Sequence, residues 1–513
     1  MDSAHPWIRT RLSVMFFLAF FIYACWMVPM ASYMGKALQL SPADIGWVYS
    51  AAAIAAIISP LFVGYVADRL FATERILAAL HLIGGAALLA GAWQTKFPGL
   101  MACMMLHTLC FMPSLALGNS LTFRNIPDAA HFPRIAMFGT IGWIASGWIV
   151  GLVLGETKNW FFFLGGGAEI LLALYCLTLP HTPPKAREAA GDVLGLKAIS
   201  LLKDPAFLFF ILCAFLVSIP ATSYFVFINP YLMETGWYAP ATLMTLGQFT
   251  EIFVMFTMSW FIAWLGLRWI LLAGMAVWAL RFALFGMLNF PLALLGVLVH
   301  GFGYCFVYVG SYIYVDKNAP EEFRASAQSF ISFLMLGVGW FIGSQLSGVV
   351  MERYPAPIPT IAAVDAQGKP IESALPRWDA PAKAPFDVRL LFAYLGEAVA
   401  GKRTEQQRAD LGALLDKDGD GRLSPEEQNA IPAEGLTIDG VKFSRDELLK
   451  LFERIAQWKV DHGLAKGTDE PIARDDWLAV QARGWRTIWR WPAIAAAVVT
   501  VLFLLSPRGK RPT

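Results

Sequence analysis

The sequence predicts an all-α membrane protein with twelve transmembrane helices in two six-helix halves and a small helical insert outside the membrane. Three observations predict it: an apolar composition, long stretches almost free of charge, and the concentration of charge in one segment. Of the 513 residues, 57% are hydrophobic, 14% aromatic and only 15% charged. This composition excludes a chain built wholly of water-soluble domains, a disordered chain, a secreted disulfide scaffold and a nucleic-acid-binding protein.

The charge is unevenly distributed along the chain. Residues 352–483 hold 18 Lys and Arg and 23 Asp and Glu, a net of −5, whereas the remaining residues hold 22 and 15, a net of +7. The acidic segment is therefore expected to be a soluble insert in a membrane protein. All cysteines lie in apolar runs, which favours small buried hydrophobic side chains over a disulfide framework: Cys25, Cys103, Cys110, Cys176, Cys213 and Cys305.

Twelve stretches are long and apolar enough to cross a bilayer as helices, which takes about 20 residues because every backbone amide must be paired inside the segment. They lie near 13–35, 45–67, 75–94, 99–122, 135–155, 159–180, 206–230, 240–264, 268–289, 291–315, 324–350 and 487–506.

Lys and Arg in the short loops predict the orientation, because positive residues remain on the cytoplasmic side. With the N-terminus inside, the inner segments carry 16 Lys and Arg residues, whereas the short outer loops carry only Lys36, Lys96 and Lys158. We therefore expect a multi-pass protein of the inner (plasma) membrane with both termini cytoplasmic. The insert at 352–484 is then extracellular, or periplasmic in a bacterium.

The longest inner loop divides the helices six and six. The expected parts are an N-terminal half at 1–180, a cytoplasmic linker at 181–205, helices seven to eleven at 206–351, the insert at 352–484, and the twelfth helix with a cytoplasmic tail at 485–513. Spans five and eleven both begin with Phe and Arg at the inner face and continue with glycines at helical spacing, which is typical of two related halves whose helices approach closely.

Glu251 in the eighth span is the clearest functional candidate, because an ionisable group inside a bilayer is costly. Gln248 stands one helical turn before it, so the amide and the carboxyl share a face. The carboxyl is expected to load and release a proton during transport. The alternative is a neutral Glu that bonds two helices together.

Other polar residues in the spans are weaker candidates. Asn119, and Asn229 before Pro230, are plausible partners for a sugar or base, and Trp143 could stack on a base. Arg281 is either the counter-charge of a buried acid or an anchor at the outer interface. Glu169 is expected to line a helix seam, and the imidazoles of His81, His107 and His300 either relay protons or pack as satisfied core residues.

Between spans two and three the chain carries Gly64, Asp68 and Arg69 in a GxxxDR pattern, which resembles the conformational motif of the major facilitator superfamily. Longer strings narrow the resemblance to its nucleoside:proton symporter family: WMVPMASYM at 26–34, FGTIGW at 138–143, RFALF at 281–285 and RASAQ at 324–328. The resemblance covers about 12–350 and 484–505 and does not cover the insert. It implies the major facilitator fold, alternating access and contact of Gln248 and Glu251 with nucleoside.

The chain departs from this family at several cavity positions. Thr140 is retained, but Ala136 stands where an Arg is expected, with Arg134 nearby. Thr222 and Phe225 replace polar amides, and Cys305 replaces an acidic residue. The resemblance therefore implies a more apolar cavity, in which Glu251 is the main carboxyl for coupling.

The insert contains a twelve-residue EF-hand pattern from Asp416 to Glu427. An EF-hand loop supplies oxygen ligands to Ca²⁺ at fixed positions, which here are Asp416, Asp418, Asp420, the carbonyl of Arg422, Ser424 and Glu427. The segment 439–447 echoes it with fewer oxygens and is expected to be a metal-poor partner. Calcium is expected as a structural ion, with a role in gating as the alternative.

The sequence thus favours a proton-coupled transporter that takes up nucleosides or nucleoside-like solutes. The alternatives are the same fold with another small polar solute, or a calcium-binding membrane receptor that transports nothing. The GxxxxGK[ST] phosphate loop of an ATP-driven pump is absent from the sequence, and we expect no enzyme and no organic cofactor. The expected partners are a solute, a proton and the lipid bilayer, with no nucleic acid, and the chain is expected to be monomeric.

Overall fold

The computed structural model describes residues 6–69, 71–128, 131–184, 196–354, 360–364, 370–374, 424–438, 441–446, 449–450, 453, 457, 460 and 474–506. Within these ranges nine helices are long and apolar enough to cross a membrane, and a bent helix pair makes a tenth. The expected all-helical membrane architecture is confirmed.

Two of the twelve expected spans do not reach this count. The apolar helix at the sixth expected span, Trp160–Cys176, has 17 residues, or about 26 Å of rise, slightly less than the bilayer core. At the second, the helix runs over 28 residues from Pro42 to Arg69, but its apolar part is described only as Pro42–Ile58.

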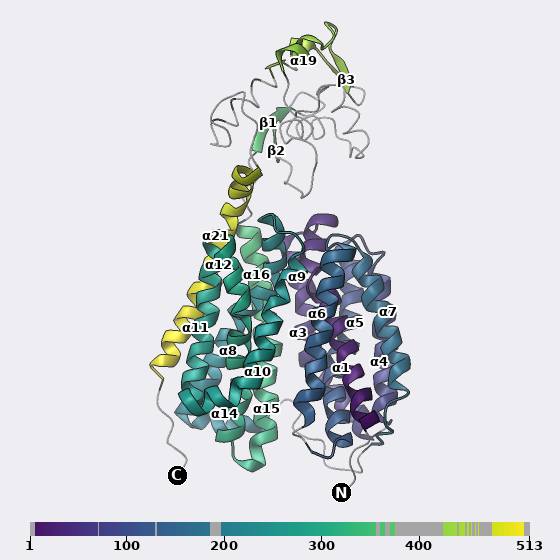
Figure 1. Cartoon of the computed structure of the whole chain (residues 1–513), viewed down its shortest axis with the longest axis vertical. Coiled ribbons are helices and arrows are strands. Elements are labelled where there is room, and N and C mark those ends of the chain that lie inside the picture. The colour runs from purple at the N-terminus through teal and green to yellow at the C-terminus, as the bar shows by residue number, and fades with distance from the viewer. Residues whose placement is uncertain are drawn as a thin grey trace. The chain divides into compact units, whose positions relative to one another are not determined.

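The N-terminal half is a bundle in which α1 packs against α6 and α7, and α4 against α5 and α7 (Figure 1). Its elements are α1 (Pro6–Met27), α2 (Met30–Ser32), η1 (Tyr33–Ala37), α3 (Pro42–Arg69), α4 (Thr73–Gly91), α5 (Phe97–Asn125), α6 (Phe132–Trp148), η3 (Ile149–Leu154) and α7 (Trp160–Cys176).

The 3₁₀ helix η4 (Leu196–Lys203) leads into the C-terminal half, where α10 packs against α13 and α11 against α12 and α13. The elements are α8 (Pro205–Glu234), α9 (Pro240–Met244), α10 (Leu246–Leu265), α11 (Leu267–Gly286), α12 (Phe290–Leu298), α13 (His300–Tyr304), η5 (Cys305–Val309), α14 (Gly310–Asn318), η6 (Glu321–Phe323), α15 (Arg324–Ser332), η7 (Phe333–Gly339), α16 (Trp340–Arg353) and α21 (Arg474–Leu504).

The two halves meet mainly at one end of the helices, where α1 finishes and α3 begins. There α16 packs on α3, and α9 packs on α6 and η3. Small residues allow this approach: a Cβ added to Gly46 would lie 2.8 Å from the carbonyl oxygen of Ser344. Close contact of glycine-containing faces is typical of helix pairs in membranes. The beginning of α1 and the end of α21 lie at the opposite end of the bundle (Figure 1).

The cysteines are all unpaired, and all except the half-buried Cys103 are buried, as expected for small apolar side chains. A second compact unit comprises 234–238 and 355–484. Its described parts include two antiparallel hairpins, β1 (Thr360–Val364) with β2 (Pro370–Ala374) and β3 (Leu436–Ile438) with β4 (Val441–Phe443), the short helix α19 (Pro425–Asn429) and the first residues of α21. The segment expected to be a second metal-poor loop thus contributes a strand to a local hairpin, in which Ile438 pairs with Val441.

Candidate functional site

Glu251 lies on α10, a mostly apolar helix, and its side chain is 16% exposed. Gln248 precedes it by one turn and is buried, and its Oε1 is a buried acceptor without a hydrogen-bond partner in the described part of the chain. A buried polar atom without a partner costs free energy unless a ligand or water satisfies it. The two side chains therefore form a polar position that is incomplete without a further donor.

A break in the facing helix brings an imidazole to Glu251. The pair Phe290–Leu298 and His300–Asn318 is bent by 43° at Val299, so His300 begins the second piece. Two glycines let this piece touch α10 directly: a Cβ on Gly301 would collide with the backbone nitrogen of Glu251, and one on Gly247 would lie 2.8 Å from Cβ of His300. Interrupted helices are a common way for transporters to build a site at mid-membrane.

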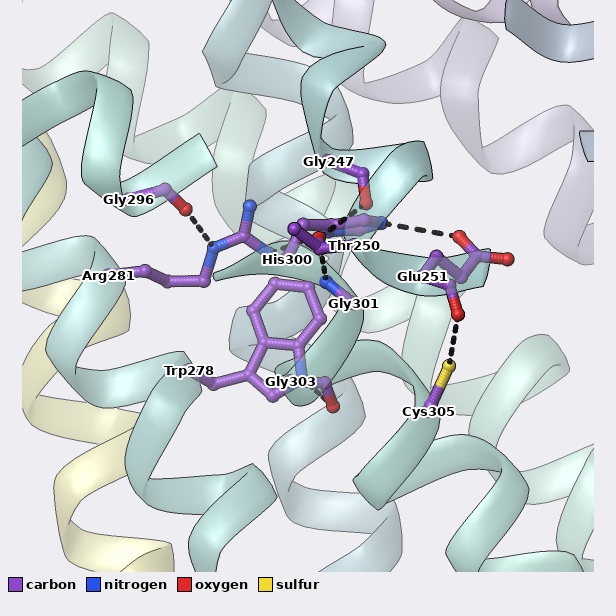
Figure 2. Close-up of polar contacts among 10 residues, drawn as sticks. All are labelled: Gly247, Thr250, Glu251, Trp278, Arg281, Gly296, His300, Gly301, Gly303 and Cys305. Atoms are coloured by element: carbon purple, nitrogen blue, oxygen red, sulfur yellow. Dashed lines mark hydrogen bonds and ion pairs between the residues drawn. The ribbon is translucent and has the colours of Figure 1, made fainter. Parts of the chain in front are cut away.

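Arg281, His300 and Glu251 form a row across three helices (Figure 2). The Arg281 guanidinium donates from Nε to the carbonyl of Gly296 at 3.1 Å, and its Nη1 lies 2.9 Å from Nδ1 of His300. His300 Nε2 lies 3.9 Å from Oε2 of Glu251. Arg281 is 0% exposed, so in this structure its guanidinium does not reach the outer interface. Its contact with the imidazole that faces Glu251 fits the other expectation, a counter-charge of a buried acid.

The contacts of Arg281 determine the tautomer of His300. A guanidinium only donates hydrogen bonds, so His300 Nδ1 must accept and the ring hydrogen resides on Nε2, directed towards Glu251. At 3.9 Å this nitrogen is too far from the carboxyl for a hydrogen bond, although it is within ion-pair range. The guanidinium also lies over the Tyr224 ring, 4.0 Å from its centroid, which adds a cation–π contact.

Three positions at which the sequence departs from the pattern of the family it resembles, Thr222, Phe225 and Cys305, contact neighbouring groups of the protein itself. Thr222 is buried and donates to the carbonyl of Ser218 at 2.9 Å. Phe225 stacks on Trp340 with ring centroids 5.1 Å apart. Cys305 is buried with its sulfur 3.8 Å from the backbone carbonyl of Glu251. These side chains therefore offer packing surface in place of the amides and the acid expected there.

The remaining cavity candidates of the N-terminal half lie on α5 and α6. Asn119 is exposed and lines a small hollow together with His81. Thr140 and Trp143 are half-buried, and Trp143 packs edge-on against Tyr23 with centroids 5.4 Å apart. The structure thus brings Gln248, Glu251 and Arg281 together in the C-terminal half, while Asn119, Thr140 and Trp143 lie in the N-terminal half.

Asn229, predicted to contact solute, has other partners in this structure. Its Oδ1 accepts from the hydroxyl of Ser32, and its Nδ2 donates to Oε2 of Glu156. Glu156 lies in the loop between η3 and α7 and is 4% exposed. Sequence reasoning missed this residue. The available signal was an acid directly after Gly155 at the end of an apolar span.

A second cluster of ionisable residues lies within the N-terminal half. His81 Nδ1 lies 3.3 Å from Oε1 of Glu169, and His107 Nδ1 lies 3.0 Å from Oε2. Glu169 and His107 are 0% exposed, and His81 is 2% exposed. The three residues come from α4, α5 and α7 and join these helices through one carboxyl. Glu169 therefore occupies a helix seam, as expected, with the two imidazoles as its partners.

Comparison with known proteins decides the family. The family model described as nucleoside H⁺ symporter matches residues 7–359. The chain belongs to the nucleoside H⁺ symporter family. It is 40% identical over 359 residues to the putative nucleoside transporter YegT of Escherichia coli K12, which covers 67% of this chain and 84% of that protein. It is 32% identical over 370 residues to the xanthosine permease of the same organism, covering 68% and 88%.

Solved structures agree with this family. The crystal structure of the nucleoside transporter NupG matches with a TM-score of 0.64 at 27% identity, over 68% of this chain and 92% of that chain. A bacterial homologue of the lysosomal transporter Spinster matches with a TM-score of 0.59 at 14% identity, over 99% and 97%, which shows the fold alone. The protein is therefore a multi-pass membrane transporter, as predicted.

For some of the predicted site residues, the structure does not describe the side chains. Gly64, Asp68 and Arg69 lie within α3, but their side chains are outside the described residues, as are Asp416, Asp418, Asp420 and Arg422 of the EF-hand pattern. Ser424 and Glu427 are described and form a capping box at the start of α19. No group of three or more potential His, Cys, Asp or Glu metal ligands occurs in the described ranges, which omit most of this loop.

Proposed function

We propose that the protein imports nucleosides or nucleoside-like solutes together with protons by alternating access between its two halves. The family match and the nucleoside and xanthosine permeases among its relatives support this function. The proposal includes twelve spans in the major facilitator arrangement, with the shorter helices Pro42–Ile58 and Trp160–Cys176 as the second and sixth spans. Both termini are cytoplasmic and the insert lies outside the cell.

The row of Arg281, His300 and Glu251 beside Gln248 is the observation that carries the proposal. The Glu251 carboxyl binds the transported proton, since it is partly exposed and accepts no hydrogen bond within the described chain. His300, held by Arg281, presents its Nε2–H towards the carboxylate after the proton leaves. Gln248 Oε1 accepts a donor of the solute, which satisfies this buried atom only while solute is bound.

The same site favours one alternative solute class. Thr222, Phe225 and Cys305 are used by neighbouring groups, so they leave fewer polar contacts for a ribose than amides would. A site of this kind suits a flat base, which can stack on aromatic side chains, better than a polyhydroxylated sugar. The second candidate function is therefore proton-coupled uptake of another small polar solute by the same residues.

We also propose that the insert binds Ca²⁺ through Asp416, Asp418, Asp420, the Arg422 carbonyl, Ser424 and Glu427. In the described part, Glu427 Oε2 accepts from the backbone N–H and hydroxyl of Ser424, at 2.9 and 3.0 Å. Two oxygen-bearing side chains of the pattern are therefore adjacent, which suits the all-oxygen shell of Ca²⁺. The ion would cross-link the loop and stabilise the insert.

Uptake by purified protein in liposomes tests these proposals. Labelled nucleosides, bases and sugars are offered with and without an inward proton gradient. Wild type should accumulate one of these classes only with the gradient, and Glu251→Gln should lose this accumulation, by at least about 100-fold, while still folding. Glu352→Gln, at the exposed end of α16, is the matched control and should behave as wild type.

The outcomes separate the candidates. Accumulation of a base or sugar without any nucleoside would favour the second candidate, and gradient-independent flux would overturn both. Removal of external calcium should lower the thermal stability and leave initial uptake rates within about twofold. A large loss of uptake would instead assign calcium to gating, and unchanged stability and uptake would count against the calcium site.

A further inference from the structure

Glu156 joins the two halves at the end of the bundle where they meet. Its Oε1 accepts the backbone N–H of Ala241 at 2.7 Å, and its Oε2 accepts from the side-chain amide of Asn229. Both donors belong to the C-terminal half, whereas Glu156 follows η3 of the N-terminal half. Asn229 in turn accepts from Ser32 of the N-terminal half. The hydrogen bonds from Glu156 to Asn229 and from Asn229 to Ser32 therefore each connect the N-terminal half with the C-terminal half.

Other contacts hold the same end together. Thr242 donates to the carbonyl of Gly147 at 3.3 Å, and the Trp148 indole donates to Thr245 at 3.0 Å. The amide of Gln345 donates to Ser50 at 2.8 Å. By the orientation proposed above, this end faces outward, so these bonds close the outer gate. Alternating access requires them to break, and Glu156 would then enter water.

The two states of the gate hold a proton at Glu156 with different affinity. In the closed gate, burial raises the pKa of Glu156 to about 7, although the Ala241 N–H, the Asn229 amide and the charge of Lys36 each lower it. In an open gate the carboxyl would be hydrated, with its ordinary pKa near 4.5. Because the closed state has the higher pKa, closure takes up a proton between these two values.

We propose that Glu156 is a second proton-binding site, at which protonation from outside removes the cost of burying a charge and so favours closure of the outer gate, where Ala241 and Asn229 contact this carboxyl. This inference rests on the proposed transport function and its orientation, and it goes beyond the site at Glu251. Among the described residues, the charged group that faces Glu156 is Lys36 of η1, and the groups of α8 and α9 that act on it are the neutral donors already named. Acidification outside would thus promote the inward-facing state before Glu251 is involved.

The test is the accessibility of a cysteine in the gate. Thr242→Cys is introduced into the full chain, and labelling from outside by a membrane-impermeant maleimide is followed in intact cells between pH 5 and 8. The rate at each pH is divided by that of Glu352→Cys, an exposed position, which removes the pH dependence of the thiol itself. Because the open fraction is lowest when Glu156 is protonated, this normalised rate should rise on the order of tenfold between about pH 5 and 7 and then level off. The chain without Thr242→Cys gives the background.

Glu156→Gln in this background should remove the pH response and keep labelling low, since a neutral amide replaces the protonated acid. Glu352→Gln should retain the wild-type response. A pH-independent normalised rate in the parent, or an unchanged normalised profile in Glu156→Gln, would overturn the inference. The labelling needs no solute, so absence of proton-coupled uptake would refute the proposed function while a pH-dependent gate could still be observed.

Discussion

The two halves each contain a glutamate beside imidazoles, but the surroundings of the two carboxyls differ. Glu169 in the N-terminal half is fully buried and has an imidazole nitrogen within 3.3 Å of each oxygen. Glu251 in the C-terminal half is partly exposed, and its nearest imidazole nitrogen is 3.9 Å away. Behind that imidazole stands a buried guanidinium, which the N-terminal cluster lacks among its described contacts.

From this comparison we propose that access and loose contact, more than burial, distinguish a carboxyl that can exchange protons from one that joins helices. A group with both oxygens in close contact must lose those contacts to change its charge. A carboxyl with one exposed side and a distant partner can change charge at lower cost. We therefore assign a structural role to Glu169 and the coupling role to Glu251.

Glu169→Gln is expected to have the largest effect on stability. Loss of the charge between two imidazoles should cost roughly 3 kcal/mol, because buried contacts with a charged group are each worth more than neutral ones. Thermal unfolding of the purified protein in detergent would measure this, with Glu251→Gln, expected to cost less than about 1 kcal/mol, as the matched variant. A stable Glu169→Gln protein that has lost proton coupling would reverse the assignment of the two carboxyls.

Gly301→Ala tests how closely the C-terminal site is packed. The new Cβ would collide with backbone atoms of α10, which cannot move as a side-chain end does, so a cost of about 2 kcal/mol and impaired uptake are expected. Gly303→Ala on the same helix is the control, since its Cβ would meet side chains at 3.4 Å. Equal unfolding temperatures and uptake rates for the two variants would show that α13 does not rest on α10 in the membrane.

Arg281→Met should have the smallest effect on stability and a specific effect on transport. Because His300 accepts from Arg281 as a neutral ring, an apolar side chain of similar length leaves no directly paired charge without its partner, which is the case that costs most. Without the donor to Nδ1, however, His300 can adopt either tautomer, and uptake should fall about tenfold, equivalent to 1.4 kcal/mol. The pH profile of uptake should change in Arg281→Met and be partly restored in Arg281→Lys; an unchanged profile would contradict a positioning role for Arg281.

The sequence predicted the parts of the fold that depend on local composition. Apolar stretches and loop charges were sufficient for an all-helical membrane protein, and family strings were sufficient for the transporter class. Glu251 and Gln248 were found because a charge in an apolar helix is costly wherever the helix lies. These inferences require no knowledge of which helices touch.

The pairings could not be predicted in the same way, because they depend on contacts between distant segments. The role of Arg281 was undecided until the bend at Val299 placed His300 beside it. Asn229 was predicted to contact solute. Its partner Glu156 is 73 residues away in the sequence, and no local pattern links the two residues. The close approach of α13 to α10 depends on Gly301, one of 43 glycines in the chain.

The glycine-rich seam between α3 and α16 has a consequence for the energetics of the transport cycle. Surfaces that meet through backbone and glycine have few side chains to rearrange, so they can separate and rejoin without repacking. The balance between the two access states would then depend on the few hydrogen bonds at that end, each worth about 1 kcal/mol net. One such bond changes the ratio of the two populations about fivefold. Single substitutions at that end would therefore shift the balance between the two access states without changing the substrate site.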